Sequence, residues 1–327
     1  MTDRNRMTMQ DLARLAGVSK MTVSRALRDS SLVSEDVRKR IKSLAREHGY
    51  RINVAARDLR LQRRKTIAVV VEMSPTDERP MSEPYPLALL GGIAQELAAA
   101  DYAMLVKVSG KITDDEVYGS DGVILLGQGA HEDAAEQLGR MGVPLVVWGS
   151  PTRAHQYVVV GSDNRHGGQL AAQQLLGAGR RRLVFLGDTD HSELSDRLEG
   201  FRPEVDRDGA ELVAVEPCDF TSASAFEATG RLLRRGVEFD GVFACNDLAA
   251  AGAINALNAT GRRVPSAVSV VGYDDAPMAA AYVPAITTIR QNWHSGGRLL
   301  ARKILQLIRG ETPASEALPT SLISRST

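Results

Sequence analysis

The sequence predicts an α/β protein. An N-terminal three-helix headpiece of the helix-turn-helix kind and a hinge helix precede two doubly wound parallel α/β sub-domains. Three observations predict this architecture. Basic residues gather at the N-terminus, two short helical stretches meet at Gly17, and beyond Lys65 short β-branched runs alternate with amphipathic stretches. Such alternation is typical of parallel sheets with helices on both faces.

The composition is that of a globular protein. The chain has 327 residues, 43% of them hydrophobic, which predicts two or three domains. No apolar run reaches the roughly 18 residues of a membrane span, and the first ten residues lack the apolar core of a secretory signal. Two cysteines, Cys218 and Cys245, indicate no disulfide framework. We therefore expect a cytoplasmic protein with no membrane partner.

The formal net charge of zero hides an asymmetry. Residues 1–65 contain 17 Lys and Arg against 7 Asp and Glu, whereas residues 66–327 contain 23 against 33. A basic segment on an acidic body indicates a polyanion partner for that segment. A solvated basic surface is the alternative that charge alone leaves open.

Capping signals divide the headpiece into helices. Thr8 is the N-cap of a first helix, with Asp11 in the capping-box position, and Gly17 can end that helix in the left-handed conformation. Ser19 then caps a second helix that runs from Lys20 to about Leu27. The glycine break between the two helices aims the second one away from its own domain.

A third helix, beginning near Ser34, closes the core of this helix-turn-helix. The second helix exposes short polar groups and long cations, which suit the phosphates and base edges of DNA. These are Lys20, Met21, Thr22, Ser24 and Arg25. A plain three-helix bundle explains the caps equally well, but it does not explain an exposed face nearly free of carboxylates. The pattern favours double-stranded DNA as the partner.

The rest of the chain predicts two sheets. The candidate strands are TIAVVVEM, AMLVKV, GVILLG, PLVVWG, RLVFLGD, ELVAVEP, GVFACN and VSVVGYD. About 260 residues exceed one doubly wound sheet, so we expect two sub-domains. Ligands of such sheets bind beyond the carboxyl ends of the strands. Two facing sheets place the ligand between them.

Side chains near the predicted strand ends suit a sugar. Phe220 and Trp293 offer aromatic faces for a sugar ring. Arg197, Asn246 and Asp274 offer a fork of donors, a mixed donor and acceptor, and a pure acceptor, which is the mixture that a polyol needs. Local roles stay open, because Asn246 and Asp274 can cap helices and Trp293 can belong to the core.

Residues 7–60 resemble the DNA-binding headpiece of the lac/galactose repressor family of bacterial transcription regulators. The resemblance rests on LA..AGVS..TVSR.L followed by VS...R..I...A.E.GY. It implies base readout by Lys20, Met21 and Arg25, with Met21 packing on a thymine methyl because it cannot hydrogen-bond a base. It implies phosphate contacts from Thr8, Ser19, Thr22 and Ser24.

Residues 53–60, NVAARDLR, match the family's hinge helix, which folds on operator DNA and inserts a leucine into the minor groove. Leu59 matches that wedge, and Ala56 matches the small residue at the hinge contact. The family usually has proline before the position of Asn53. Ile52 stands there instead, which makes the start of the hinge less rigid. A charged linker helix is the alternative.

The remaining sequence matches the family's effector-binding core, which resembles periplasmic sugar-binding proteins with three crossings between sub-domains. VGSDNRHGGQ, DRLEGF, FDGVFACNDLAAAG and PAITTIRQ carry this match. TTIRQ marks the last crossing, so a helix from about Trp293 to Ile308 returns to the first sub-domain. The resemblance assigns effector hydroxyls to Arg197, Asn246 and Asp274, ring stacking to Phe220 and Trp293, and contacts from the first sub-domain to Tyr85 and Gln128.

Two segments depart from the family pattern. Ser109 to Asp121 offers only 13 residues between two predicted strands, near the minimum for a parallel crossover, so its helix is very short or missing. Ser74 to Pro86 carries four prolines and predicts an ordered loop or a mobile lid. Either change can alter the dimer surface or the pocket.

Enzyme motifs are weak or missing. GQGA at Gly127 lacks the third glycine of a dinucleotide loop, His131 has no second histidine at the spacing of a zinc site, and no G-x-S-x-G occurs. We expect no catalysis, no cofactor and no metal. The expected domains are 1–52 (headpiece), 53–65 (hinge and linker) and 66–327 (core), with sub-domains at about 66–160 plus 292–320 and about 161–289.

The predicted function is a ligand-responsive repressor of carbohydrate-utilisation genes, which releases a pseudo-palindromic operator when a mono- or disaccharide binds between the sub-domains. A homodimer is expected because a two-fold dimer matches such an operator, and the C-terminal end shows no heptads for a tetramer. Two alternatives stay open. One is a corepressor-dependent regulator that responds to a non-sugar metabolite, and the other is a sugar-binding protein without regulatory role.

Overall fold

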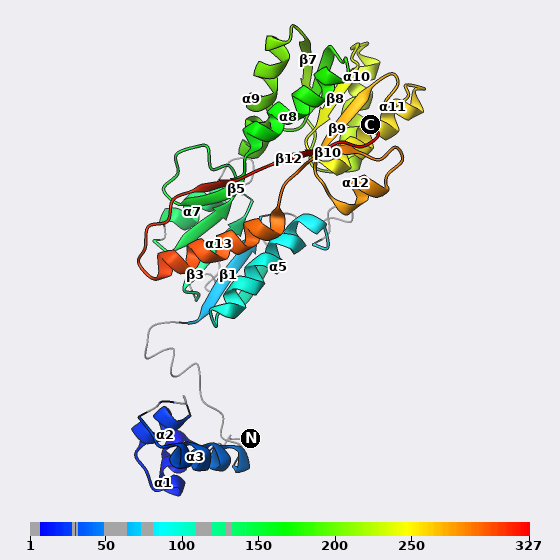
Figure 1. The fold of residues 1–327 in the computed structure, drawn as a ribbon. Coiled ribbons are helices and arrows are strands. Elements are labelled where there is room, and N and C mark those ends of the chain that lie inside the picture. Colours follow the sequence, from blue (N-terminus) through cyan, green and yellow to red (C-terminus); the bar gives the residue numbers. More distant parts are fainter. Residues whose placement is uncertain are drawn as a thin grey trace, which may run out of the picture. The chain divides into compact units, whose positions relative to one another are not determined.

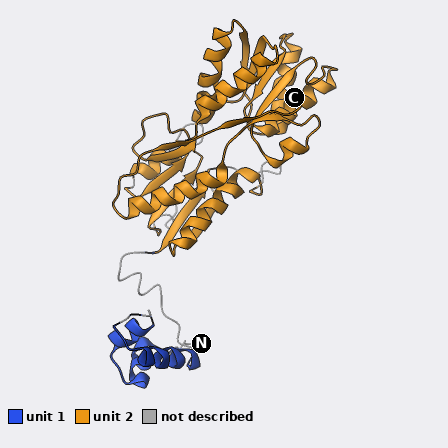
Figure 2. Cartoon of the chain, viewed as in Figure 1, with its two compact units in different colours: residues 1–64 blue, residues 65–327 orange. Residues whose placement is uncertain are grey.

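The computed structural model describes residues 7–27, 30, 32–48, 64–72, 81–108, 119–127, 133–140 and 142–327. The chain divides into two compact units, residues 1–64 and 65–327, which Figure 2 colours separately. Each unit has its own hydrophobic core. No helix of the described ranges is long and apolar enough to cross a membrane.

Three helices form the headpiece (Figure 1): α1 Met9–Ala16, α2 Lys20–Ala26 and α3 Glu35–Glu47. The predicted helices are thus confirmed, with boundaries that differ by about one residue. Leu12, Val23 and Ile41 supply one fully buried side chain from each helix. Because each short helix buries only one face, tertiary packing rather than intrinsic propensity holds the headpiece together.

The first sheet of the core has the strand order β11-β5-β4-β3-β1-β2, and every pairing in it is parallel. Helices α5 Pro84–Ala99 and α13 Trp293–Ile308 cover one face, and α7 Asp133–Arg140 covers the other. The strands are β1 Thr66–Val71, β2 Ala103–Val108, β3 Gly122–Leu126, β4 Leu145–Trp148, β5 Val158–Ser162 and β11 Glu316–Leu318. The central strands read as continuous apolar runs because they are covered on both faces.

The second sheet has the order β12-β10-β9-β8-β6-β7, and β12 alone of its strands pairs antiparallel, with β10. Its strands are β6 Arg182–Leu186, β7 Glu211–Glu216, β8 Gly241–Ala244, β9 Ser269–Asp274, β10 Thr287–Arg290 and β12 Ser321–Ile323. The helices around it are α8 Asn164–Gly177, α9 Ser192–Arg207, α10 Ser222–Arg234, α11 Asp247–Ala259 and α12 Pro277–Ala281. Pairs α8–α9 and α10–α11 cover its two faces.

The chain passes between the two sheets three times, after β5, β10 and β11. The expectation that TTIRQ marks the last crossing is wrong. Residues 287–290 form β10, which precedes the second crossing, and residues 319–320 carry the third (Figure 1). The last crossing joins two three-residue strands, which are too short to produce a periodic pattern in the sequence.

The proline-rich segment is shorter than predicted. Helix α5 begins at Pro84, within the stretch predicted as a loop. A proline in the first helical turn removes an N–H that has no helical partner in any case, so it starts the helix rather than breaking it. Residues 73–80 and 109–118 lie outside the described residues, which leaves the predicted lid and the shortened crossover untested.

Glycines allow two helix pairs to approach to backbone contact. A Cβ at Gly297 on α13 would lie 2.1 Å from the carbonyl oxygen of Leu89 on α5. A Cβ at Gly200 on α9 would lie 1.9 Å from the carbonyl oxygen of Arg165 on α8. These close contacts fix α13 and α9, the helices that carry Trp293 and Arg197.

Candidate functional site

Local hydrogen bonds fix the turn between α1 and α2. Gly17 has φ 63°, and its amide donates to the carbonyl of Arg14 at 3.2 Å. The amide of Asp11 donates to Thr8 Oγ1 at 3.2 Å, and the amide of Thr8 donates to Asp11 Oδ2 at 3.1 Å. The hydrogen bonds from Thr8 hold the pKa of the Asp11 carboxyl below its usual value. The predicted capping box and left-handed C-cap are confirmed.

Helix α2 presents one face to solvent. Ser19 Oγ accepts from the amide of Thr22 at 3.1 Å and thereby caps the helix. Val23 and Ala26 are fully buried, whereas the side chain of Met21 is 62% exposed. The side chains outside the core are those predicted to contact DNA, namely the exposed Lys20, Met21 and Arg25 and the half-buried Thr22 and Ser24. This helix contains no carboxylate, so its face offers hydroxyls, cations and one thioether to a polyanion.

The predicted hinge residues Asn53, Ala56 and Leu59 lie outside the described residues, as does Gln128. Their assigned roles stay predictions. Thr8, which was predicted to contact phosphate, already shares its hydroxyl with Asp11 Oδ2 at 2.5 Å. Its hydroxyl oxygen keeps acceptor capacity only, so a phosphate contact there depends on loosening this bond.

Arg197 is held rigidly at the carboxyl edge of the second sheet. Its Nε donates to Asn164 Oδ1 at 3.0 Å, and a terminal nitrogen donates to the carbonyl oxygen of Cys245. The guanidinium lies over the ring of Tyr273, 3.6 Å from the ring centroid. The side chain is only 5% exposed. A guanidinium has five N–H donors, so this arrangement leaves some of them for a ligand.

Asp274 ends β9 with φ 116°, a conformation that residues other than glycine rarely adopt. Gln291 Nε2 donates to Asp274 Oδ1 at 2.5 Å, and Ser162 Oγ donates to Gln291 Oε1 at 2.6 Å. Ser162 ends β5 and Gln291 follows β10, so both stand where the chain crosses between sheets. Hydrogen bonds therefore connect the carboxylate of Asp274, which was predicted to bind the effector, to residues at the first two crossings. Strained backbone of this kind is common at binding sites.

Asn246 and Phe220 are brought together by a direct contact. Asn246 Oδ1 accepts from the amide of Ala249 at 2.7 Å, which caps α11, and its Nδ2 donates to the carbonyl oxygen of Phe220 at 3.0 Å. The Phe220 ring is half-buried and packs edge-to-face on His191 at 5.2 Å between centroids. Both ends of the Asn246 amide are thus used locally, which matches its alternative role as a cap.

Tyr85 and Trp293 meet in the first sub-domain. Their ring centroids lie 5.8 Å apart in an edge-to-face arrangement. Trp293 is 8% exposed and belongs to the core cluster of that sub-domain. Its Nε1 is buried without a hydrogen-bond partner, and leaving such a group unpaired costs about 1–3 kcal/mol.

Glu72, which was not predicted as a site residue from the sequence, also has a buried polar atom without a hydrogen-bond partner. It directly follows β1, and its Oε2 is buried without a partner. Burial raises the pKa of the Glu72 carboxyl above its usual value. The signal in the sequence was a lone carboxylate directly after a buried apolar strand, the position where ligand-binding groups of parallel sheets occur.

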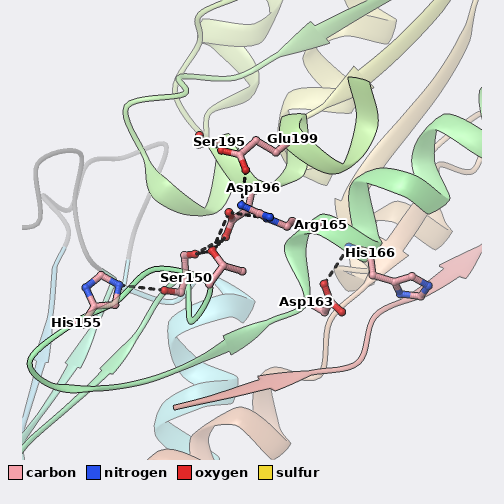
Figure 3. A network of polar contacts seen from close by, with 9 residues as sticks. Ser150, His155, Asp163, Arg165, His166, Ser195, Asp196 and Glu199 are labelled. Carbon is pink, nitrogen blue, oxygen red and sulfur yellow. Dashed lines mark hydrogen bonds and ion pairs between the residues drawn. The ribbon is translucent and has the colours of Figure 1, made fainter. Parts of the chain in front are cut away.

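A polar network across the two sub-domains was also not predicted (Figure 3). Asp196 on α9 is 1% exposed and accepts hydrogen bonds from the hydroxyls of Ser150 and Thr152, which follow β4. Arg165 Nε lies 3.5 Å from Asp196 Oδ1, and Arg165 also pairs with Glu199. Residues 44 and 46 positions apart in the chain make these contacts, so no local pattern reveals them.

Asp247 is a third buried carboxyl, and its altered pKa was not predicted from the sequence. Its Oδ1 accepts from Thr288 Oγ1 at 2.6 Å, and its Oδ2 accepts from the amide of Ala276 at 2.7 Å. Burial, aided by the negative charge of Asp274, raises the pKa of Asp247 to about 8. Asp247 follows Asn246 at the same edge of the second sheet. Within the described residues, no cluster of three or more His, Cys, Asp and Glu could hold a metal ion.

Comparison with known proteins assigns both units. The family model described as bacterial regulatory proteins of the lacI family matches residues 8–53, and that of the periplasmic binding protein-like domain matches residues 172–327. The transcriptional regulator CelR of Thermobifida fusca is 34% identical to the chain over 339 residues, covering 99% of each protein.

The chain belongs to the lacI family. It is therefore a helix-turn-helix transcriptional regulator, and the predicted resemblance is confirmed. This lacI-family chain is similar to the CelR–cellobiose complex, with 33% identity, 98% and 99% coverage of the two chains, and a TM-score of 0.73. It shares its fold with the lac repressor dimer bound to operator and the anti-inducer ONPF, with 24% identity, 98% and 99% coverage and a TM-score of 0.85. The predicted fold class is confirmed.

Proposed function

We propose that the protein is a sugar-responsive repressor of carbohydrate-utilisation genes. It binds a pseudo-palindromic operator as a homodimer and releases it when a mono- or disaccharide binds between the two sub-domains of the core. The observation that carries the proposal is that Arg197, a fork of donors, and Asp274, an acceptor, both lie at the carboxyl edge of the second sheet of a lacI-family core. The relative CelR has been solved with cellobiose, which makes cellobiose the first sugar to test.

On the DNA side, α2 enters the major groove with its carboxylate-free face. Met21 packs on a thymine methyl, while Lys20 and Arg25 reach base edges. Phosphate contacts from Thr8, Ser19, Thr22 and Ser24 set the register. In the hinge, Asn53 and Ala56 position a helix whose Leu59 wedges the minor groove.

On the effector side, Arg197 and Asp274 bind hydroxyl groups, and Phe220 and Trp293 supply faces for the sugar ring. Asn246 acts by holding the Phe220 loop through its hydrogen bond rather than by touching the ligand. Tyr85 supports Trp293 from α5, and Gln128 contacts the effector from the first sub-domain. The polar groups fix orientation, while the rings provide most of the buried contact area.

The response follows from linkage. If sugar weakens operator binding by some factor, operator weakens sugar binding by the same factor. The sugar shifts the sub-domains, which changes the spacing of the two hinge helices of the dimer. The protein performs no catalysis and acts in the cytoplasm, where its DNA target is located.

A fluorescence anisotropy titration tests this function. The full-length protein is titrated into a labelled duplex that carries the pseudo-palindrome upstream of its own gene, with a scrambled duplex of equal length as control. We expect specific binding that weakens steeply with salt, because each neutralised phosphate releases counterions. Cellobiose should lower the affinity for the palindrome. Equal affinity for both duplexes would contradict the proposal.

A further inference from the structure

Cys218 and Cys245, the only cysteines of the chain, follow different strands of the second sheet. Cys218 follows β7 and Cys245 follows β8, and β6 lies between these two strands. Both side chains are buried, with exposed fractions of 4% and 0%. The proposed function uses neither sulfur atom, so the placement of both thiols at this edge of the sheet calls for an explanation of its own.

The space between the two cysteines exists because residue 187, directly after β6, is a glycine. A Cβ at Gly187 would lie 2.9 Å from the Cβ of Cys245. The amide of Cys245 donates to the carbonyl of Leu186 at 2.8 Å, and the amide of Asp188 donates to the carbonyl of Cys218 at 3.1 Å. The end of β6 therefore has one cysteine on each side, and the missing side chain lets the sulfur atoms approach.

The thiol of Cys245 points at the loop that carries Cys218. Its Sγ donates to the carbonyl oxygen of Asp219 at 3.8 Å, and it also shares a hydrogen bond with the Cys218 thiol. This contact with Cys218, together with burial, raises the pKa of the Cys245 thiol well above its usual value. The two sulfur atoms are thus already neighbours, so a small movement of the loop is enough to join them.

The two thiols differ in their access to solvent. Cys218 is flanked in the chain by Pro217 and Asp219, which are both exposed, so a small oxidant can approach it from outside. Cys245 is fully enclosed, and its raised pKa keeps it in the thiol form, which is the unreactive one. Reaction with a peroxide therefore begins at Cys218, and Cys245 is the second thiol, which resolves the oxidised sulfur.

The pair adjoins groups that the proposed function assigns to the effector. The carbonyl oxygen of Cys245 accepts from the guanidinium of Arg197. The next residue, Asn246, donates to the carbonyl oxygen of Phe220 at 3.0 Å, and Phe220 stands two positions after Cys218. A covalent link between the two cysteines draws these segments together. It therefore displaces both the Phe220 ring and the carbonyl group that fixes Arg197.

We propose that Cys218 and Cys245 form a reversible disulfide when a peroxide oxidises the protein, and that this disulfide weakens effector binding. The two cysteines are then a redox modification site in a regulator that is otherwise controlled by its ligand. Disulfides of cytoplasmic proteins usually have such transient roles. The effect on the effector rests on the proposed function, whereas the formation of the disulfide does not.

The reaction consumes one peroxide for two thiols. The Cys218 sulfur attacks one oxygen of hydrogen peroxide, the O–O bond breaks, and the leaving hydroxide takes the thiol proton as water. The Cys245 sulfur then attacks the sulfenic sulfur, the S–O bond breaks, and a second water leaves with the Cys245 proton. The two sulfur atoms lose two electrons to the peroxide oxygens. A small thiol reductant reverses the reaction through a mixed disulfide.

Thiol titration of the full-length protein under denaturing conditions tests whether the disulfide forms. The reduced protein should show both thiols, the peroxide-treated protein none, and the protein reduced again with dithiothreitol both. Peptide mapping without reductant should find the peptides of Cys218 and Cys245 linked within one chain. The proposal is overturned if both thiols survive peroxide, if they are lost without a linked pair of peptides, or if the link joins two chains.

Calorimetric titration with cellobiose tests the consequence for the effector. We expect the oxidised protein to bind cellobiose ~10-fold more weakly than the reduced protein, and reduction to restore the affinity. Affinity for the operator without sugar should not change, because the headpiece is a separate compact unit. An oxidised protein that carries the disulfide and binds cellobiose as the reduced protein does would overturn the regulatory part of the proposal.

Cys218→Ala is the matched control, since it removes one sulfur at the edge of the loop and leaves Cys245 without a partner. After the same peroxide treatment it should bind cellobiose as the reduced wild type does, which separates the disulfide from oxidation at other side chains. Cys218→Ser provides a second variant, and thermal unfolding verifies that each one is folded. If the reduced wild type binds no cellobiose, the proposed sugar response fails, while thiol titration still decides whether the disulfide forms.

Discussion

The hydroxyl of Ser150 donates a hydrogen bond to the carboxylate of Asp196, although the two residues are 46 positions apart and belong to different sub-domains. Both side chains are almost completely buried, with exposures of 0% and 1%. Thr152 adds a second hydroxyl to the same carboxylate at 2.8 Å. This polar contact fastens the loop after β4 to the helix that carries Arg197.

Replacing Asp196 by Ala should destabilise the core. The change removes the carboxylate that accepts from the buried hydroxyl of Ser150 and from the exposed Thr152, and we expect a loss of about 2–3 kcal/mol in the free energy of unfolding. Denaturant titration measures it. Asp206→Ala, an exposed residue on the same helix, is the control and should change stability by about 0.5 kcal/mol or less. Equal effects of the two substitutions would show that the contact contributes nothing.

Asp247 should make stability depend on pH. Its folded pKa is raised to about 8, whereas in the unfolded chain it is about 3.9. The folded state therefore holds a proton that the unfolded state loses between these values, so stability falls as pH rises from about 4 to 8. Asp247→Asn can accept from the amide of Ala276 and donate to Thr288 without ionising. We expect the melting temperature of this variant to exceed that of the wild type by an amount that grows from pH 5 to pH 9.

Asp206→Asn serves as the matched control for this pH series, because it removes an exposed carboxylate from a helix surface. Its melting curve should follow the wild type at every pH. A constant offset between Asp247→Asn and the wild type across the series would refute the assignment of the pH dependence to Asp247.

Gly17→Ala should loosen the turn between α1 and α2. Gly17 has φ 63°, and a Cβ there meets no atom within 4 Å, so only backbone strain opposes the change. That strain is about 1–2 kcal/mol. We expect amide hydrogen exchange across residues 9–26 to accelerate ~5- to 20-fold. Gly91→Ala on α5, which also has open space but an ordinary helical backbone, should leave exchange in the headpiece unchanged.

Arg197→Ala should abolish the response to cellobiose and leave operator binding intact. The guanidinium of Arg197 supplies the donors proposed to bind the sugar at the carboxyl edge of the second sheet. Operator binding should persist because the headpiece is a separate compact unit. Operator titrations with and without cellobiose measure both properties. Arg202→Ala, an exposed arginine on the same helix, should respond as the wild type does. Loss of operator binding itself in Arg197→Ala would contradict this division of roles.

Much of the fold could be predicted because its signals are local. The box between Thr8 and Asp11, the left-handed Gly17 and the cap at Ser19 act within three or four residues, and all three occur as predicted. The helix Trp293–Ile308 was predicted to its last residue. Strand β5 and the short strands β10 to β12 were missed, since their own apolar patterns are brief.

The candidate site could be predicted only as a set of residue types. Arg197 and Asp274 do lie at one edge of the second sheet, as strand-end positions indicated. The side-chain amide of Asn246 bonds to Ala249, three positions away, and to Phe220, 26 positions away. The capping bond to Ala249 could be predicted from the sequence, whereas the bond to Phe220 could not. Glu72 was overlooked because no sequence pattern shows that its buried Oε2 lacks a hydrogen-bond partner.

By itself the sequence determined the order of helices and strands, the basic headpiece and the family to which the chain belongs, because periodicity, caps and charge are properties of neighbouring residues. Only the tertiary structure decided which polar groups are satisfied and which are not. It joined Asp196 to Ser150, tied Asp274 to the crossings through Gln291, and left Glu72 and Trp293 unpaired. Hydrogen bonding in a buried site depends on distance and direction between groups remote in the chain, and these exist only after the sheets have packed.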